Sequence, residues 1–388
     1  MRIISINVHY QDGLGYQDYY LGKSWKAMGH DVHFISSDWH FDYPDYDSVK
    51  HIIGDKYVGV GTFINEYGVP VHRLKATTRK QTGLMWLRGF EEKLLELKPD
   101  IIISHGVFTH QSIRLLYLKN KLNCPIVFDD HTTINVLRQS LGSKLVFTLF
   151  RKFFAQKMIE VAYKIVGISD SCTGVLNKTF GLKGDKVVMI PLGTDTNLFK
   201  QDSDLRKKYR SFLGVSDETI VVLYTGKIYE DKRVDLLVDA LNDETVTKNR
   251  NIVIHVVGVI SAGYKVYFEE KLKTSKHKVI YRNAVSQQEL PEIYNGADIS
   301  VWPAHTTTST IDASACGCPI ICSDYMKERY SNDNGFGIKE GDINELKVAL
   351  KELIKNKSLR EEMGGRGKKL IEDTLSWNKI AKQFIDKW

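Results

Sequence analysis

Short apolar runs alternate with helical patterns along the 388 residues of this chain, and this alternation constrains the fold more than any other feature. It is typical of parallel β-sheets that are covered by helices. The strands predicted from these runs are Ile3–Val8, Val32–Ser36, Ile101–Ser104, Ile126–Asp129, Lys164–Ile168 and Val187–Ile190 in the first half, and Ile220–Thr225, Ile252–Gly258, Val279–Arg282, Ile299–Pro303 and Pro319–Ser323 in the second. Each half therefore has enough strands for its own doubly wound sheet, and the length of the chain also favours two domains.

The two halves open in the same way, with a strand, a loop that contains glycine, and a helix. In the first half this loop spans residues 10–16, and in the second it begins at Gly226 and precedes a helix over residues 234–241. Glycine after a first strand lets the backbone approach a phosphate, so Gly13, Gly15 and Gly226 are candidate phosphate-binding residues. The third glycine of the dinucleotide fingerprint is absent, so a tight turn explains Gly13 and Gly15 equally well. This absence also argues against an NAD-dependent dehydrogenase.

The composition is that of an ordinary globular chain, with a net charge of +7. This mild basic excess suits an anionic substrate or a membrane surface, but a solvated surface rich in lysine produces the same value. Five cysteines without a C-x-x-C pair indicate a reduced protein, and the grouped Cys316, Cys318 and Cys322 are expected to be core thiols rather than zinc ligands. The N-terminus has no signal-peptide pattern and no apolar run reaches about 18 residues, so a cytoplasmic location is expected.

Residues 296–323, GADISVWPAHTTTSTIDASACGCPIICS, combine a buried strand, a polar loop, a helix of small residues and a second buried strand. Thr308, Ser309 and Thr310 precede or begin the helix, and Asp312 lies in its first turn. Because backbone amides at a helix N-terminus favour negative charge, a phosphate is expected beside these hydroxyl residues. The alternative is that they only cap the helix.

Two lysines flank the loop after the first strand of the second half, in the sequence TGKIYEDKR. Lys227 and Lys232 are five residues apart at the carboxyl end of a central strand, where two ammonium groups can converge on one diphosphate. Each could instead be an ordinary solvated surface lysine.

His105 and His131 stand at the carboxyl ends of predicted strands in the first half. Open parallel sheets bind ligands at that edge, so both rings are functional candidates, and the alternative is a hydrogen-bonded structural role. Asp129 and Asp130 beside His131 could orient its ring or raise its pKa. No Ser-His-Asp arrangement and no metal-binding cluster is recognised in the sequence, and no metal is expected.

The segment from Arg138 to Lys157 has five basic residues and no acidic ones, interleaved with Leu, Val and Phe. This pattern fits a basic amphipathic helix on an anionic membrane surface. The alternative is a helix that packs its apolar side chains, Leu145, Phe147, Leu149 and Phe153, onto its own domain and exposes Lys and Arg to water.

Taken in order along the chain, these segments resemble the retaining glycosyltransferases of family 4, which have the two-domain GT-B architecture. The segments that carry the resemblance are GHDV at Gly29–Val32, KPDIIISHG at Lys98–Gly106, PLGTDTNLF at Pro191–Phe199, GKIYEDKRVDLL at Gly226–Leu237, ELPEIYNGADISVWP at Glu289–Pro303, IDASACGCPIICSD at Ile311–Asp324 and NGFGIKEGD at Asn334–Asp342. The resemblance covers nearly the whole chain, and the ordered series is more specific than any one segment.

The resemblance implies an α/β fold of two doubly wound Rossmann-like domains that face a central cleft. The acceptor-side domain is expected over residues 1–195 and the nucleotide-sugar-binding domain over 196–372. The last helix, in residues 373–388, is expected to cross back to the first domain.

The family also implies roles for residues of the second domain. Lys227 and Lys232 match the pair of basic residues that hold the donor diphosphate, and Thr308 and Ser309 match backbone positions that cradle the phosphates. Asp312 matches the second Glu of the family's E-x7-E motif, which contacts the donor ribose.

Further positions match other parts of the donor site. His131 corresponds to a first-domain histidine close to the reacting sugar, and Gly13 and Gly15 lie in the first-domain loop that meets the donor. Arg282 and Ala284 lie where the family grips the base through backbone groups.

The chain departs from the family at the E-x7-E motif. Ala304 stands where the first Glu is expected, and the second Glu is shortened to Asp312. Contacts to the donor sugar must then come from other residues, such as His305 or Thr306. This departure leaves open a loss of activity.

The resemblance therefore implies an enzyme that transfers a sugar from a UDP- or GDP-sugar to a hydroxyl acceptor with retention, in the synthesis of a cell-surface polysaccharide or glycolipid. No cofactor or metal is expected, and the partners are the donor and a glycan or lipid-linked acceptor rather than a nucleic acid. The expected place is the cytoplasm, including the inner face of the plasma membrane. Two alternatives stay open: a nucleotide-sugar epimerase of the same architecture, and a nucleotide-sugar binding protein without catalysis.

Overall fold

The computed structural model describes residues 1–12, 16–42, 46, 50, 54–77, 85–134, 137 and 140–386. The chain divides into two compact units, the first formed by Met1–Leu192 with Trp377–Trp388 and the second by Gly193–Ser376. The sequence placed these divisions after residues 195 and 372.

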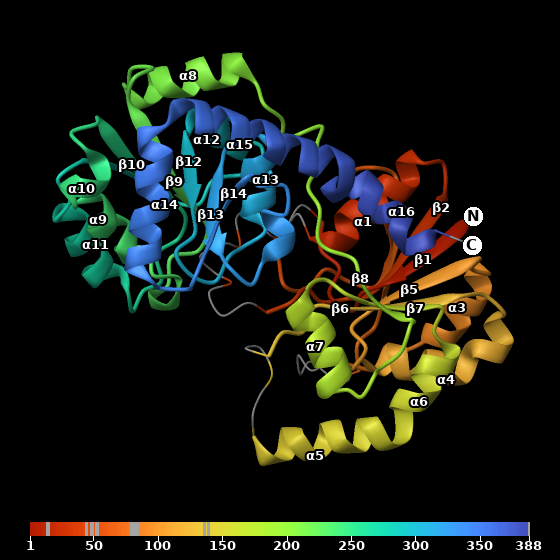
Figure 1. Cartoon of the computed structure of the whole chain (residues 1–388). Helices are drawn as coiled ribbons and strands as arrows, with labels where there is room; N and C mark the ends of the chain where they lie inside the picture. The colour runs from red at the N-terminus through yellow and green to blue at the C-terminus, as the bar shows by residue number, and fades with distance from the viewer. Residues whose placement is uncertain are drawn as a thin grey trace. The chain divides into compact units, whose positions relative to one another are not determined.

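The first unit contains, in its described residues, an eight-stranded sheet with the order β3-β4-β2-β1-β5-β6-β7-β8 (Figure 1). All neighbouring strands are parallel except the antiparallel pair β3 and β4. The strands are β1 (Arg2–Ile6), β2 (Asp31–Ser37), β3 (Gly61–Ile64), β4 (Pro70–Leu74), β5 (Ile101–His105), β6 (Ile126–Asp130), β7 (Lys164–Gly167) and β8 (Val187–Met189). The helices are α1 (Gln17–Ala27), α3 (Phe90–Leu97), α4 (His110–Leu122), α5 (Leu141–Phe150), the π-helical turn η1 (Arg151–Ala155), α6 (Gln156–Val161), α7 (Asp170–Lys178) and α16 (Trp377–Ile385).

The second unit contains a sheet of six described strands, all parallel, in the order β11-β10-β9-β12-β13-β14. The strands are β9 (Ile220–Thr225), β10 (Ile252–Val257), β11 (Lys278–Arg282), β12 (Ile299–Val301), β13 (Ile320–Ser323) and β14 (Gly335–Ile338). The helices and helical turns are α8 (Ser203–Leu213), η2 (Glu230–Lys232), α9 (Asp235–Leu241), α10 (Glu244–Thr247), α11 (Lys265–Lys273), α12 (Leu290–Gly296), α13 (Ser309–Ala315), η3 (Lys327–Arg329), α14 (Ile343–Lys355), α15 (Lys357–Leu370) and η4 (Ile371–Leu375).

Helices cover both faces of each sheet, as the continuous apolar strands require. In the second unit α9, α10, α11 and α14 pack together on one face, and α8, α12, α13 and α15 pack together on the other. Strand β9 is buried along its whole length, because helices cover both of its faces. The doubly wound sheets predicted from the sequence are confirmed.

The strand order reverses beside the first strand of each sheet, between β1 and β5 in the first unit and between β9 and β12 in the second. Loops that leave these strands diverge to opposite faces, which opens a crevice at the carboxyl ends of the strands. Ligands of doubly wound folds bind at such points. The segments that follow these four strands are therefore the places where the fold predicts ligand binding.

The runs predicted as strands are all strands in the structure, but three strands were missed. Strand β14 has the sequence GFGI, whose glycines break an apolar run, and all four residues of β3 are exposed. Strand β4 begins with proline at the edge of the parallel sheet. Pairing with a neighbour, rather than local sequence, forms these three strands.

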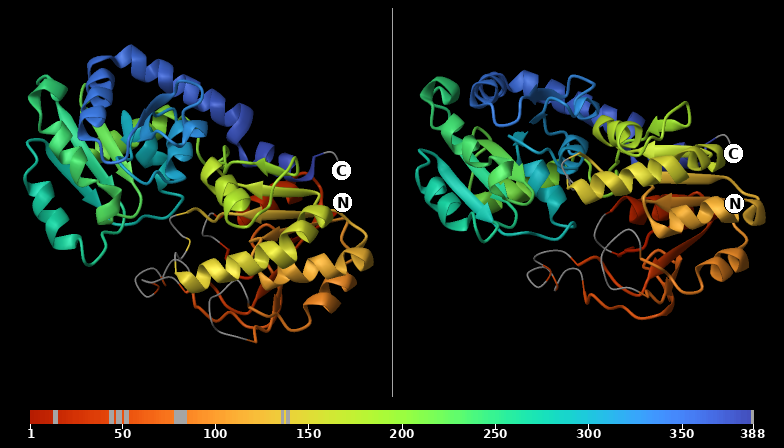
Figure 2. Two further views of the ribbon diagram at one scale, coloured as in Figure 1. Left: turned by 60° about the horizontal axis from the view of Figure 1, so that its bottom comes forward. Right: turned by 90° about the horizontal axis from the view of Figure 1, so that it is seen from below.

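The last helix, α16, packs beside α1 in the first unit, as Figures 1 and 2 show. The Trp25 indole donates a hydrogen bond to the Ala381 carbonyl at 2.9 Å, and the rings of Tyr20 and Trp377 stack with centroids 5.3 Å apart. Phe384 is fully buried, whereas Trp388 lies outside the described residues.

Helix α5 differs from the packed amphipathic helix that one alternative predicted. Leu145, Leu149 and Phe153 are 61%, 44% and 58% exposed, so the prediction that they pack onto their own domain is wrong. Phe147 does pack on the core, together with the buried Phe150. The reason is that apolar residues occupy both sides of this helix and only one side faces the domain. No described helix is long and apolar enough to cross a bilayer.

Candidate functional site

Gly226 follows β9 at the switch point of the second unit and has a φ of 136°, a conformation that glycine adopts readily. Its amide donates to the Val257 carbonyl at 3.0 Å. A Cβ atom on the neighbouring Gly258 would lie 1.8 Å from the Gly226 oxygen, so only glycine fits there. The two glycines bring the ends of β9 and β10 together and leave the start of the loop without side chains.

Lys232 is held in place by the loop that follows β12. Its Nζ atom donates to the His305 carbonyl at 2.7 Å. Burial lowers the pKa of Lys232, and the nearby positive charge of Lys227 lowers it further, while Asp231 and Glu340 oppose this shift. Lys232, one of the two lysines predicted to act together, is thus tied to the loop before α13.

The loop after β12 is organised by Glu340, a residue that was not predicted from the sequence. Its Oε1 atom accepts hydrogen bonds from the His305 amide at 2.5 Å, the Ser323 hydroxyl at 2.9 Å and the Tyr325 hydroxyl at 3.0 Å. His305 has a φ of 47°, which is uncommon for a residue other than glycine. Surrounding contacts must maintain this backbone conformation. Glu340 supplies such a contact, whereas Ala304 beside it is buried and offers no polar group.

Helix α13 begins at Ser309, directly after this loop, as predicted. Thr308 precedes it in a helical conformation and makes no capping hydrogen bond, so the capping alternative is wrong for this residue. The Thr310 hydroxyl is buried and donates to the Thr307 carbonyl at 3.0 Å. The first amides of a helix have no partners within the helix, which makes such an end a candidate anion-binding position, and here the Thr310 amide already donates to the Thr307 carbonyl at 3.4 Å.

Asp312 lies in the first turn of α13 with a largely desolvated carboxyl group. Burial raises its pKa to about 7, although a hydrogen bond from Thr194 and the charge of Arg329 act in the opposite direction. The Thr194 hydroxyl donates to Oδ1 of Asp312 at 2.5 Å. Such a carboxyl can gain further hydrogen bonds from a bound hydroxyl compound when it ionises.

Arg282 and Ala284 lie at and after the end of β11, and their groups already have partners in the protein. The Arg282 guanidinium donates to Tyr209 and Glu289, and its carbonyl accepts from the Gly258 amide at 3.0 Å. The Ala284 amide donates to the Asn283 side chain at 2.8 Å. A base bound through these backbone groups would have to share or replace these bonds.

In the first unit, His105 and His131 meet at one carboxylate. Oδ2 of Asp129 accepts from Nδ1 of His105 at 2.8 Å and from Nε2 of His131 at 3.1 Å, and Ser5 contacts the other nitrogen of His105. Asp129 is fully buried, His105 is 10% exposed and His131 is 44% exposed. The sequence anticipated that Asp129 would orient His131, but not that it would also hold His105.

The charges of this group depend on one another. Burial acts to raise the pKa of Asp129, but the two imidazoles hold it below its usual range. Burial acts to lower the pKa of His131, but the Asp129 carboxylate outweighs this effect and the pKa is raised. Nearby Asp18 is desolvated, which raises its pKa, and accepts a hydrogen bond from Asn7 at 2.8 Å. His131 is therefore favoured in its charged form.

The same three side chains are of types that bind metals. Potential ligand atoms of His105, Asp129 and His131 lie within 4.8 Å of one another, so these three side chains could hold one ion. This cluster is not apparent in the sequence, because His105 and Asp129 come from two strands and meet only when β5 and β6 pair. In the structure Oδ2 of Asp129 accepts from both imidazoles, whereas its buried Oδ1 has no hydrogen-bond partner among the described residues.

The fold thus brings several predicted residues to one edge of the second sheet. Gly226, Lys227 and Lys232 follow β9, and His305, Thr306, Thr308, Ser309 and Thr310 follow β12, its neighbour across the switch point. Arg282 and Ala284 lie two strands away, at the end of β11. Gly13 and Gly15 lie outside the described residues.

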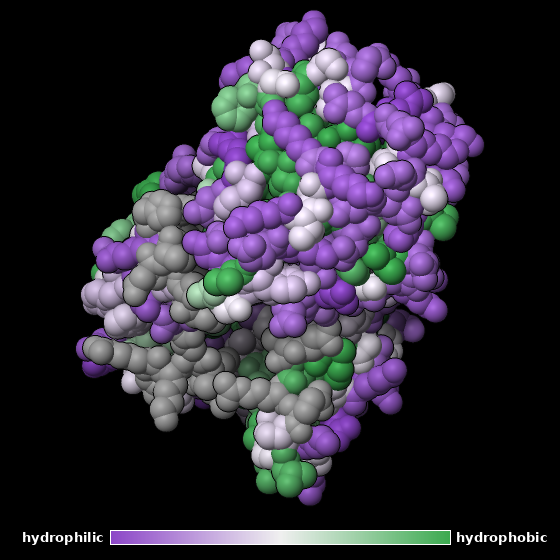
Figure 3. Space-filling model, turned by 90° about the vertical axis from the view of Figure 1, so that its left-hand side faces the viewer, coloured by the Kyte–Doolittle hydropathy of each residue, from purple (hydrophilic) through white to green (hydrophobic). Residues whose placement is uncertain are grey.

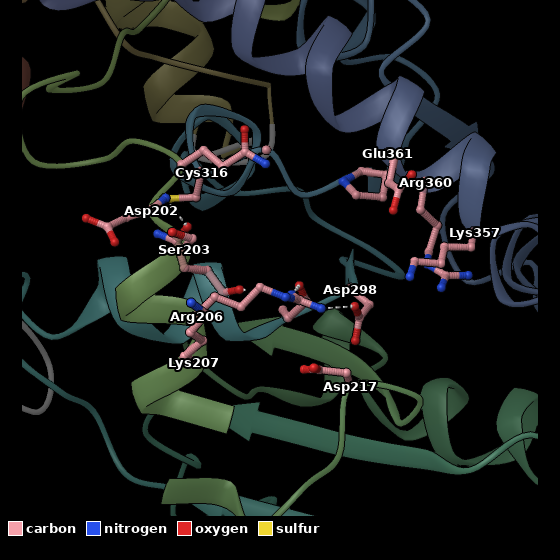
Figure 4. Close-up of a pocket in the computed structure, with 15 residues that line it drawn as sticks. Asp202, Ser203, Arg206, Lys207, Asp217, Asp298, Cys316, Lys357, Arg360 and Glu361 are labelled. Carbon is pink, nitrogen blue, oxygen red and sulfur yellow. Dashed lines mark hydrogen bonds and ion pairs between the residues drawn. The ribbon is translucent and has the colours of Figure 1, made fainter. Parts of the chain in front are cut away.

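A cavity of about 700 Å³ lies elsewhere in the second unit, at the amino ends of β9, β12 and β13 (Figure 4). Its walls carry four basic and four acidic side chains, namely Arg206, Lys207, Lys357, Arg360, Asp202, Asp217, Asp298 and Glu361. Arg206 and Asp298 are paired at 2.6 Å. With its charges balanced and at the opposite edge from the switch-point loops, this cavity includes none of the predicted site residues.

Two α/β units, each with a doubly wound sheet, form the GT-B architecture. Residues 206–370 match the family model "Glycosyl transferases group 1", and residues 12–198 match "Glycosyltransferase Family 4". The chain belongs to the group 1 glycosyltransferases of family 4.

Similar proteins support this assignment. The capsular polysaccharide biosynthesis glycosyltransferase CapM of Staphylococcus aureus is 25% identical over 60% of this chain and 63% of its own length. The D-inositol 3-phosphate glycosyltransferase of Kineococcus radiotolerans is 24% identical over 76% of this chain and 72% of its own. The alignment with CapM thus spans less than two thirds of that relative.

Solved structures share the fold. Sucrose-phosphate synthase from Thermosynechococcus elongatus is 18% identical in sequence and has a TM-score of 0.68. The match covers 98% of this chain and 96% of the synthase chain. Anabaena HepE, in complex with UDP and glucose, is 15% identical in sequence and has a TM-score of 0.67. The match covers 100% of this chain and 98% of the HepE chain. At these identities the likeness concerns the fold alone.

Proposed function

We propose that this chain transfers a sugar from a nucleoside diphosphate donor, a UDP- or GDP-sugar, to a hydroxyl acceptor with retention at the anomeric carbon. The observation that supports the proposal is that Lys227 and Lys232 follow β9, while α13 begins after β12, the neighbour of β9 at the switch point of the second sheet. The hydrogen bond from Lys232 to the His305 carbonyl ties the lysine loop to the loop before α13. Two cations and a helix N-terminus are suited to a diphosphate.

The chemistry proposed for this site is stabilisation of the leaving group. As the glycosidic bond breaks, negative charge grows on the diphosphate, where Lys227, Lys232 and the amides of Thr308 to Thr310 stabilise it. Groups that are already oriented toward such charge contribute about 10² to 10³ in rate each. The acceptor hydroxyl then attacks from the side that the leaving phosphate vacates, and its proton passes to that phosphate. The lysines supply the positive charge, so the reaction is proposed to be independent of metal ions.

Two further residues complete the proposed donor site. Asp312 accepts hydrogen bonds from the ribose hydroxyls through its carboxylate. We also propose that His131, whose ring is oriented by Asp129, acts on the reacting sugar, as the family resemblance implies. Because Ala304 replaces the first Glu of the family motif, His305 and Thr306 are proposed to contact the sugar in its place.

The names of relatives support the class of product. One is a capsular polysaccharide enzyme, and another, from Mycolicibacterium smegmatis, is a GDP-mannose-dependent phosphatidylinositol monomannoside mannosyltransferase. We therefore propose a glycan or lipid-linked acceptor, used at the cytoplasmic face of the membrane in polysaccharide or glycolipid synthesis.

A donor screen tests the proposal. Stabilisation of the protein by UDP- or GDP-sugars in thermal unfolding identifies the donor, because a ligand raises the apparent stability by mass action. The identified donor is then incubated with an acceptor panel, and the product anomer is determined by NMR. The proposal predicts a product with the anomeric configuration of the donor.

Incubation with the donor alone separates the alternatives. Conversion of the donor without acceptor indicates an epimerase, and tight binding without turnover over the whole panel indicates a binding protein. The second alternative is favoured by one observation, the apolar and buried Ala304 at the position of the first Glu.

A further inference from the structure

The outer side of α5 presents a row of large apolar side chains to solvent. Leu141 is 85% exposed, and Leu145, Val146, Leu149 and Phe153 are 61%, 42%, 44% and 58% exposed. Four of them recur at intervals of four residues, from Leu141 to Phe153, which places them along one side of the continuous helix formed by α5 and η1. Figure 3 shows apolar side chains gathered in its lowest part, where α5 lies. We call these five residues the α5 stripe.

The helix is fixed to its unit by its other side. Phe150 is buried, and Phe147 and Phe154 pack on the hydrophobic core of the first unit. The ring of Phe150 lies 5.3 Å from that of Phe108 and 5.6 Å from that of Phe180, centroid to centroid. The α5 stripe is therefore displayed by a well-packed helix. Exposed apolar patches of this kind mark sites of interaction.

The charges around the stripe have one sign. Lys144, Arg151 and Lys152 are exposed, and no acidic residue occurs from Ser140 to Ile159. The Lys152 ammonium lies 5.4 Å from the centre of the Phe153 ring, so basic and apolar groups share the same part of the surface. This combination suits a partner that is apolar within and negatively charged at its surface.

We propose that α5 docks this protein on the surface of an anionic lipid bilayer. The α5 stripe enters the boundary between headgroups and acyl chains, and the basic side chains contact lipid phosphates. A symmetric contact with a second copy fits less well, because it would bring these basic side chains against their own equivalents. Docking is independent of the sugar-transfer chemistry, and it would hold the enzyme beside an acceptor carried in the membrane.

The test is flotation of the full chain with phosphatidylcholine vesicles that contain or lack phosphatidylglycerol. The variant is Leu145→Gln with Leu149→Gln, and the control is Val266→Gln, which changes a 76% exposed apolar residue of α11 in the other unit. We expect the wild type and the control to float with the anionic vesicles, and the double variant to bind more weakly by about a hundredfold or more, because each buried leucine contributes about a factor of ten or more. Circular dichroism confirms that the variant is folded.

A second variant tests the role of charge. Lys144→Glu with Lys152→Glu leaves the stripe intact and is expected to reduce binding to anionic vesicles, as is high salt. Equal flotation of the wild type and the leucine variant would overturn the proposal. So would a wild type absent from the lipid fraction at low salt, or a dimer that the leucine substitutions abolish. Transfer to a water-soluble acceptor, measured in parallel, should be unchanged in the leucine variant, so a failure of docking is distinguishable from a failure of the proposed reaction.

Discussion

The carboxyl group of Asp312 provides a test in which stability and function change in opposite directions. Burial raises its pKa from 3.8 to about 7. Between pH 3.8 and about pH 7, Asp312 keeps its proton in the folded chain but has lost it in the unfolded chain. The stabilisation is therefore fully present below about pH 4 and is lost as the pH rises through 7. A rise of about three units corresponds to an upper bound of about 4 kcal/mol.

Asp312→Asn removes the ionisation but keeps the oxygen that accepts from Thr194. Relaxation of the protein and entry of water reduce this upper bound, so at pH 8 the variant should be more stable than the wild type by about 2 kcal/mol. At pH 5 the wild type has lost only part of its stabilisation, and the variant should be more stable by about 1 kcal/mol. For a unit of this size, about 1 kcal/mol corresponds to about 2–4 °C in the unfolding midpoint. We therefore expect the midpoint of the variant, relative to wild type, to rise by about 2–4 °C between pH 5 and pH 8.

Thermal unfolding at pH 5, 6, 7 and 8 measures this difference, with Asp373→Asn as a control because Asp373 is exposed. At the same time the variant should bind the donor about tenfold more weakly, because a neutral amide accepts weaker hydrogen bonds from ribose hydroxyls than a carboxylate does. A stability difference that is constant or falls with pH would refute the desolvation argument. Unchanged donor affinity in calorimetric titration would refute the ribose contact.

Three other substitutions or treatments have defined outcomes. Glu340→Ala removes the acceptor of three hydrogen bonds in the loop after β12, so donor KM in steady-state assays should rise about tenfold or more, whereas exposed Lys339→Ala should leave it unchanged. Asp129→Asn replaces a carboxylate that holds two imidazoles and should lower the free energy of unfolding in denaturant titration by about 2 kcal/mol; no loss would contradict its structural importance. EDTA should leave the transfer rate unchanged, and a loss restored by a divalent ion would contradict the proposed independence of metal ions.

Much of the fold could be predicted because buried parallel strands are continuous apolar runs, which any such sheet requires. The missed strands β3, β4 and β14 lack that pattern and form because neighbouring strands offer hydrogen-bonding edges. The orientation of α5 was not predictable from periodicity, since Phe147 and Leu149 lie on different sides of a helix that is apolar on both. Which side faces the core depends on the rest of the first unit.

The candidate site was predictable where one segment supplies several groups, as at Lys227 and Lys232 or at the start of α13. The site was not predictable where a residue bonds to a partner that is distant in the sequence. Glu340 lies 35 residues after His305, and nothing local to either residue indicates their contact. The shared carboxylate of Asp129 was not predictable for the same reason, because His105 reaches it only through the pairing of β5 with β6.

The most direct measurement of the central claim is the transfer rate of Lys232→Ala at saturating donor, compared with the wild type and with Lys339→Ala, an exposed lysine of the same unit. If Lys232 stabilises the leaving diphosphate, kcat should fall about 10² to 10³-fold while the unfolding transition changes little. The Lys339→Ala rate should equal that of the wild type. A Lys232→Ala enzyme that turns over at a rate near the wild type would contradict the assignment of the donor diphosphate to this site.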